Sequence, residues 1–141
     1  MVMKNNLLNL YKNLLVLIYL FDEKFSRIFT LGRTKVFKET VDVIDISGLK
    51  DRIEKFEPFI DKFFDELLVN VTEFQEDKIE HLKSEVSWSL KQCMSYLNLL
   101  KGIKGTHTDA NALTDPRTLA ALLLYKANLQ RIQDGLSSIQ S

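Results

Sequence analysis

Apolar residues recur at alternating steps of four and three along residues 7–29 of this 141-residue chain. Side chains at those offsets share one face of an α-helix, so the spacing predicts a long helix that packs lengthwise against others. The positions of this first stripe are Leu7, Tyr11, Leu14, Ile18, Phe21, Phe25 and Ile28. Val16 and Leu20 lie about half a turn away, on the otherwise polar face. Residues 14–21 are therefore apolar all round, and we expect the bundle or a partner to cover them.

Two further stripes repeat this spacing. The second, in residues 49–74, consists of Leu49, Ile53, Phe56, Ile60, Phe63, Leu67, Val71 and Phe74. Pro58 interrupts it, and because proline lacks a backbone N–H we expect the helix to kink or restart near Phe56-Glu57. The third, in residues 76–101, consists of Ile79, Leu82, Val86, Leu90, Cys93, Leu97 and Leu100.

Neither glycine nor proline separates the second stripe from the third. Asn70 with Glu73, and Thr72 with Gln75, have the spacing of a capping box, in which two side chains bond the free N–H groups at a helix start. We therefore expect a turn close to residues 72–77 and two helices of similar length. One continuous helix of about 50 residues is the alternative, and it would need a coiled-coil partner.

The fourth stripe follows a glycine-containing loop at residues 102–114. Asp115-Pro116 predicts its start, because an acidic cap followed by proline at the first helical position is typical of helix N-termini. Its buried positions are Leu119, Leu122, Tyr125, Leu129, Ile132, Leu136 and Ile139, and Gly135 suggests fraying near its end. Four stripes of comparable length predict an all-α, up-down antiparallel four-helix bundle in one domain, residues 1–141. A short irregular or helical connector is expected at about residues 32–47.

Composition agrees with a folded helical domain. Apolar residues make up 45% of the chain and charged residues 27%, a balance that excludes both a disordered chain and a membrane protein. The apolar run at residues 14–21 is far shorter than the roughly 20 residues of a membrane span, so none is expected. A single cysteine, Cys93, excludes an internal disulfide framework and favours a reducing, cytoplasmic location.

Few residues suggest catalytic chemistry. Cys93 belongs to an apolar stripe and is expected to be an inert core thiol. Of the two histidines, His81 lies on a helix, whereas His107 lies with Asp109 in the glycine-containing loop and is the better candidate for a site. The chain has no Glu-x-x-His motif, glycine-rich phosphate loop or zinc-binding spacing. We therefore expect no enzyme activity, cofactor or metal.

A known family is locally similar to the second stripe. The similar residues are Pro58-Phe59-Ile60-Asp61-Lys62-Phe63-Phe64-Asp65-Glu66-Leu67-Leu68-Val69-Asn70, which resemble a segment of the helical anticodon-binding tail of bacterial glycyl-tRNA synthetase β subunits. The resemblance implies a helical segment and contact with tRNA. It covers under a tenth of the chain, and residues 72–77 depart from the family's pattern, so no binding residues are carried over.

The leading hypothesis is a non-enzymatic protein–protein interaction module, an adaptor, regulatory or assembly subunit that associates with itself. Its candidate interface consists of Val16, Tyr19, Leu20, Trp88, Tyr96 and Leu99, because surplus apolar surface marks interaction sites. One alternative is a nucleic-acid-contacting module that uses the basic cluster Lys24, Arg27, Arg33, Lys35 and Lys38. Another is a small-molecule site in the bundle near the expected kink at Pro58.

Overall fold

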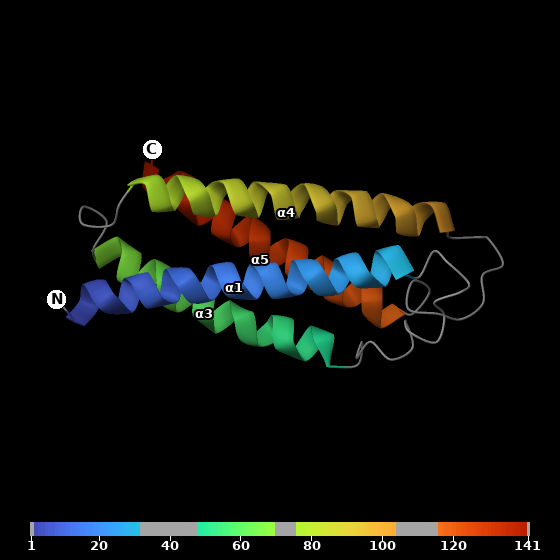
Figure 1. Cartoon of the computed structure of the whole chain (residues 1–141), viewed down its shortest axis with the longest axis horizontal. Helices are drawn as coiled ribbons and strands as arrows, with labels where there is room; N and C mark the ends of the chain where they lie inside the picture. Colours follow the sequence, from blue (N-terminus) through green and yellow to red (C-terminus); the bar gives the residue numbers. More distant parts are fainter. Residues whose placement is uncertain (1, 32–47, 70–75, 104–115, 141) are drawn as a thin grey trace.

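A computed structural model describes residues 2–31, 48–69, 76–103 and 116–140. Four helices account for nearly all of them: α1 (Val2–Leu31), α3 (Leu49–Val69), α4 (Glu76–Ile103) and α5 (Pro116–Gln140). Successive helices run in opposite directions along the long axis of the molecule (Figure 1). The predicted all-α four-helix bundle is confirmed. The expected connector at 32–47 lies outside the described residues.

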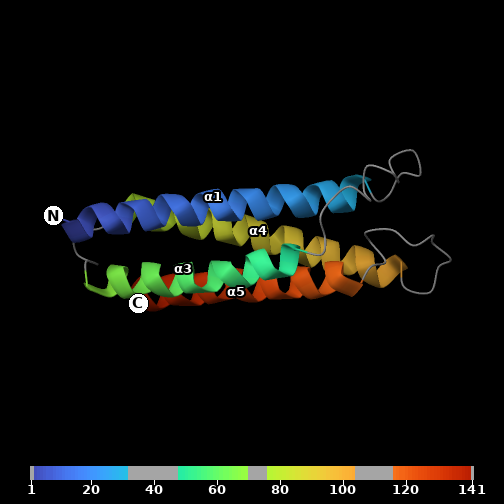
Figure 2. The same cartoon turned by 90° about the horizontal axis from the view of Figure 1, so that it is seen from below.

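The helices form two parallel pairs, α1 with α4 and α3 with α5 (Figure 2). The antiparallel contacts join α1 to α3 and α4 to α5. Within the part of the chain that the structure describes, α3 and α4 are not among the closely packed pairs, although they follow one another in sequence. These two helices therefore face each other across the bundle.

The first stripe forms the buried face of α1. All seven of its positions are buried, and they belong to one core that also receives side chains from the other three helices. The helix exists because this face removes apolar surface from water, at about 1.5–3 kcal/mol for each large side chain that becomes fully buried. The prediction for α1 is confirmed at every position of the stripe.

Pro58 lies inside an uninterrupted helix, so the alternative of a restart there is wrong. Its ring is on the exposed side of α3, while Phe56 and Ile60 on either side are buried. Proline in a helix interior costs about 3 kcal/mol. Because the apolar positions before and after Pro58 share one buried face, packing offsets that cost and keeps both halves in one helix.

The two-helix alternative for residues 49–101 is confirmed, since α3 ends at Val69 and α4 begins at Glu76. The expected capping residues between 70 and 75 lie outside the described residues. The predicted start of the last helix is also confirmed, because α5 begins at Pro116. None of the described helices is long and apolar enough to cross a membrane.

Two stripes are displaced by one residue in the structure. On α4 the buried position is Ser89, and Leu90 is only half-buried. On α5 the buried position is Thr118, and Leu119 is exposed. The predictions that Leu90 and Leu119 are the buried positions are wrong. A strict alternation of three and four residues passes through Ser89 and Thr118 instead.

Gly135 marks a close approach of two helices rather than a frayed end. α5 continues to Gln140, and a Cβ atom added at Gly135 would lie 2.5 Å from Cζ of Phe64 on α3. The absence of a side chain lets the Phe64 ring pack directly against the α5 backbone. Glycine costs about 1 kcal/mol relative to alanine in a helix interior, so this contact has to compensate for it.

Gly135→Ala is therefore expected to lower the free energy of unfolding by about 1–2 kcal/mol, because crowding of the Phe64 ring outweighs the gain in helix propensity. In a Phe64→Ala background the same change should stabilise the protein by up to about 1 kcal/mol. Urea unfolding of the four proteins in this double-mutant cycle gives the coupling. Equal effects in both backgrounds would show that the ring does not constrain position 135.

Candidate interaction surface

The middle of α1 presents apolar side chains to solvent. Val16 is 54% exposed, Tyr19 is 69% exposed and Leu20 is 45% exposed. They follow one another at steps of three and one, so they share the outer side of the helix, opposite the buried stripe. The sequence predicts that residues 14–21 are covered all round. Within the described residues the bundle covers one side of this stretch, where Leu14, Ile18 and Phe21 are buried, and leaves the outer side exposed.

Trp88 extends this surface onto α4. Its side chain is 53% exposed, and it immediately precedes Ser89, whose hydroxyl bonds the Asp22 carboxylate of α1. Since α1 and α4 run parallel and pack together, this hydrogen bond sets Trp88 level with Phe21, within one helical turn of Tyr19. We call these four exposed residues the α1/α4 surface: Val16, Tyr19, Leu20 and Trp88.

The other two candidate interface residues pack mainly within the chain. Tyr96 stacks on Phe29 with ring centroids 4.3 Å apart and an interplanar angle of 13°. Leu99 is half-buried and packs against the core. Tyr96 and Leu99 therefore contribute less accessible apolar surface than the four residues of the α1/α4 surface.

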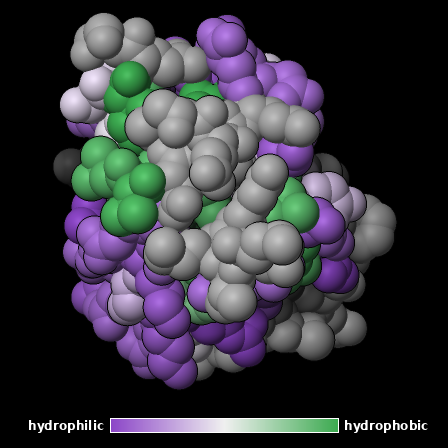
Figure 3. Space-filling model, turned by 90° about the vertical axis from the view of Figure 1, so that its left-hand side faces the viewer, coloured by the Kyte–Doolittle hydropathy of each residue, from purple (hydrophilic) through white to green (hydrophobic). Residues whose placement is uncertain are grey.

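A second group of exposed apolar residues is absent from the sequence-based interface. Met94 on α4 and Leu119 and Leu123 on the neighbouring α5 are all exposed. The one-residue shift of the α5 stripe hid Leu119, which the pattern assigns to the core. This group lacks aromatic side chains, whereas tyrosine and tryptophan are the residues most enriched in protein interfaces. At the end where α1 begins and α3 and α5 end, hydrophobic patches are visible among the hydrophilic side chains (Figure 3).

Beneath the α1/α4 surface lies a polar cluster that joins three helices. The Tyr125 hydroxyl donates to Oδ1 of Asp22 at 2.6 Å, and the Ser89 hydroxyl donates to Oδ2 of the same carboxylate at 2.6 Å. The Tyr125 oxygen also lies 3.1 Å from the carbonyl oxygen of Ile18. Because these partners come from α1, α4 and α5, the hydrogen bonds of the cluster fix the relative positions of the three helices.

Burial controls the ionisation of this cluster. Desolvation raises the pKa of Asp22 above its ordinary value, although the hydrogen bonds from Ser89 and Tyr125 act in the opposite direction. Burial, together with the charge of Asp22, also raises the pKa of the Tyr125 hydroxyl. For Cys93, burial raises the pKa to about 12, so its thiol is protonated at neutral pH. The nucleophilic form of cysteine is the thiolate, so burial disfavours the reactive form of Cys93.

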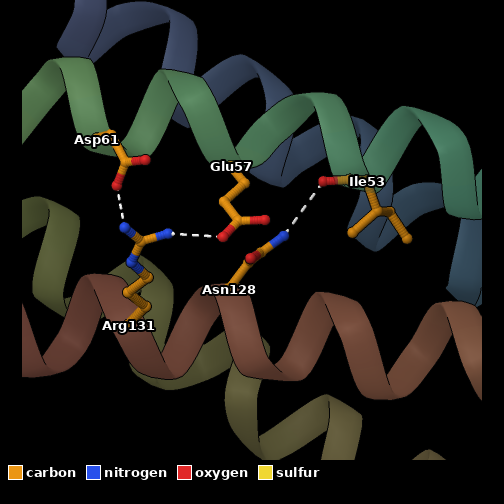
Figure 4. Close-up of polar contacts among 5 residues, drawn as sticks. All are labelled: Ile53, Glu57, Asp61, Asn128 and Arg131. Atoms are coloured by element: carbon orange, nitrogen blue, oxygen red, sulfur yellow. Dashed lines mark hydrogen bonds and ion pairs between the residues drawn. The ribbon is translucent and has the colours of Figure 1, made fainter.

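On the opposite side of the bundle, polar contacts connect α3 to α5 (Figure 4). The buried Asn128 amide donates to the carbonyl oxygen of Ile53 at 3.2 Å. Arg131 bonds both Glu57, at 3.1 Å, and Asp61, the carboxylates that flank Pro58 along α3. Exposed ion pairs contribute little stability, so we assign these contacts to holding the register of the two helices.

The remaining candidates are scattered. Arg27 is exposed and Lys24 is half-buried on α1, whereas Arg33, Lys35 and Lys38 lie outside the described residues. His107 and Asp109 lie outside them as well, and His81 is exposed on α4. Among the described residues, no three His, Cys, Asp or Glu side chains gather in a way that could hold a metal ion.

Comparison with protein-family models, curated proteins and solved structures found no match to this chain. The short resemblance to the glycyl-tRNA synthetase tail is therefore not extended by any of them. In the structure, residues 58–69 form the second half of α3, where Ile60, Phe63 and Leu67 enter the core. The apolar spacing of that segment is thus explained by packing within this bundle.

Proposed function

We propose that this protein is a non-enzymatic interaction module that binds a second copy of itself through the α1/α4 surface. The observation that carries the proposal is the exposure of Val16, Tyr19 and Leu20 on the outer face of a helix whose inner face is already buried. Apolar side chains grouped on an otherwise polar helix face mark interaction sites. Tyr19 and Trp88 add the large, rigid side chains that dominate binding energy in protein interfaces.

The chemistry of the buried cluster supports a binding role over a catalytic one. Asp22, Ser89 and Tyr125 satisfy one another inside the bundle, and the Cys93 thiol is held protonated. The exposed apolar side chains instead lie on the outside of the bundle, where they are accessible to a partner. The basic-cluster alternative stays a prediction, because three of the five basic residues lie outside the described part of the chain. The small-molecule site near Pro58 stays a prediction as well.

Light scattering behind a sizing column tests this function. The wild-type protein should have the mass of a dimer at low and at high salt, because an apolar interface is not weakened by screening. Val16→Glu combined with Leu20→Glu should give a monomer, since dimerisation would then bury like charges against one another. Leu123→Glu is the matched control, because Leu123 is 48% exposed on a different face and its substitution should leave the dimer intact.

Three outcomes would contradict the proposal. A monomeric wild-type protein at all concentrations would exclude self-association. A dimer that Leu123→Glu splits and the α1 double variant does not would move the interface to α4 and α5. A salt-sensitive complex with nucleic acid in place of a dimer would favour the basic cluster, since binding to phosphates weakens steeply with salt.

A further inference from the structure

From the charges that flank the α1/α4 surface, we infer that the two copies pair with their α1 helices antiparallel, and that Lys12 of each copy faces Glu23 of the other. This inference rests on the proposed function and specifies the geometry of the same surface. On the outer side of α1, a basic residue precedes the exposed apolar residues and an acidic residue follows them. Lys12 lies one turn before Val16, Glu23 lies one turn after Tyr19, and both charged side chains are exposed.

Two-fold symmetry decides between the possible alignments. In a dimer of this symmetry the same patch meets itself, so that if one residue contacts a second, the second contacts the first in return. An axis that crosses α1 midway between Val16 and Tyr19 places each of these residues opposite the other. Because Lys12 and Glu23 are equally distant from that axis, by about 8 Å at 1.5 Å per residue, they also meet.

The parallel alignment lacks this complementarity. It would place Lys12 opposite Lys12 and Glu23 opposite Glu23, and like charges across an interface disfavour the pairing. The antiparallel alignment converts both repulsive pairs into two attractive ones. The outer face of α1 is thus complementary to itself in one direction only, and this favours a second copy as the occupant.

Charge reversal at the two positions tests the alignment. Lys12→Glu and Glu23→Lys should each weaken the dimer about tenfold at low salt, because symmetry makes every reversal act at two pairs. The double variant Lys12→Glu/Glu23→Lys should return to within about threefold of the wild type, because both attractive pairs are then restored. Sedimentation equilibrium gives the dissociation constants, and the fluorescence of Trp88, the single tryptophan, reports the same transition on dilution.

The design separates local pairing from net charge. The two single variants carry net charges of opposite sign, and the double variant keeps the formal charge of +0. Lys62→Glu, at an exposed position on α3, matches the charge change of Lys12→Glu and should leave the dissociation constant unchanged. Single variants as tight as the wild type, or a double variant no tighter than either, would overturn the antiparallel alignment. A wild-type monomer, or a Val16→Glu/Leu20→Glu variant that still dimerises, would overturn the proposed function and this alignment together.

Discussion

Truncation of Tyr125 to alanine is expected to lower the free energy of unfolding by about 4–5 kcal/mol, a large fraction of the roughly 5–15 kcal/mol typical of folded proteins. Tyr125 is among the largest fully buried side chains of the core. Its ring stacks on Phe25 with centroids 5.5 Å apart and lies 5.4 Å from Phe21. Its hydroxyl is also a donor to Asp22, so truncation leaves both a cavity and a carboxylate with one donor fewer.

Urea unfolding followed by circular dichroism at fixed protein concentration measures this loss. Leu123→Ala is the matched control on the same helix, and because Leu123 is 48% exposed its truncation should change stability by at most about 0.5 kcal/mol. Tyr125→Phe keeps the ring and removes only the hydroxyl, so it should cost about 1–2 kcal/mol. A loss below about 1.5 kcal/mol for Tyr125→Ala would show that the ring is not part of a tightly packed core.

The architecture was predictable because the stripes are long and regular. Every position of the first stripe is buried in the structure, from Leu7 to Ile28. A helix that must bury one face repeats the same signal over seven positions, so a single misleading residue does not change the result. The end of α3 and the start of α4 were harder, since no glycine or proline separates them. The capping-box spacings of Asn70 with Glu73 and of Thr72 with Gln75 were the signal that favoured two helices.

The polar cluster was not predictable from the same pattern. Asp22 follows Phe21 at the edge of the buried stripe, and a charged residue there is normally assigned to solvent. Its partners Ser89 and Tyr125 lie 67 and 103 residues away, on two other helices. A pattern within one helix carries no information about such partners. The one available signal was Ser89 itself, a polar residue at a position where strict alternation requires a buried one.

The sequence predicted apolar residues on the polar face of α1, but it did not predict whether they are exposed. Val16 and Leu20 interrupt the polar face of their helix, and the sequence leaves open whether the bundle or a partner covers them. The structure removes the first possibility for the described residues, since both side chains remain about half exposed. Trp88 was recognised as surplus to its stripe, but its place beside α1 depends on the Ser89–Asp22 hydrogen bond and on the parallel packing of the two helices.

Removal of both hydroxyl donors to Asp22, by Ser89→Ala with Tyr125→Phe, is expected to cost about 2–4 kcal/mol at pH 7, and the cost should shrink as the pH falls towards 4. Without the two hydrogen bonds, the partly buried carboxylate keeps its desolvation penalty and loses what offsets it. Protonation removes the charge and with it most of that penalty. Urea unfolding of the wild-type protein and the double variant between pH 4 and pH 7 measures the effect.

The sign of this dependence follows from the direction of the pKa shift. Burial raises the pKa of Asp22 in the folded protein above its value in the unfolded chain, which is about 3.9 for aspartate. The folded state then binds the proton more tightly, so the resulting stability is fully present below the unfolded pKa and is lost as the pH rises through the folded pKa. Asp22→Asn cannot titrate, and the stability of the wild-type protein relative to this variant should fall as the pH rises from 4. A relative stability that rises instead would place the folded pKa below the ordinary value, and the two hydrogen bonds would then outweigh desolvation.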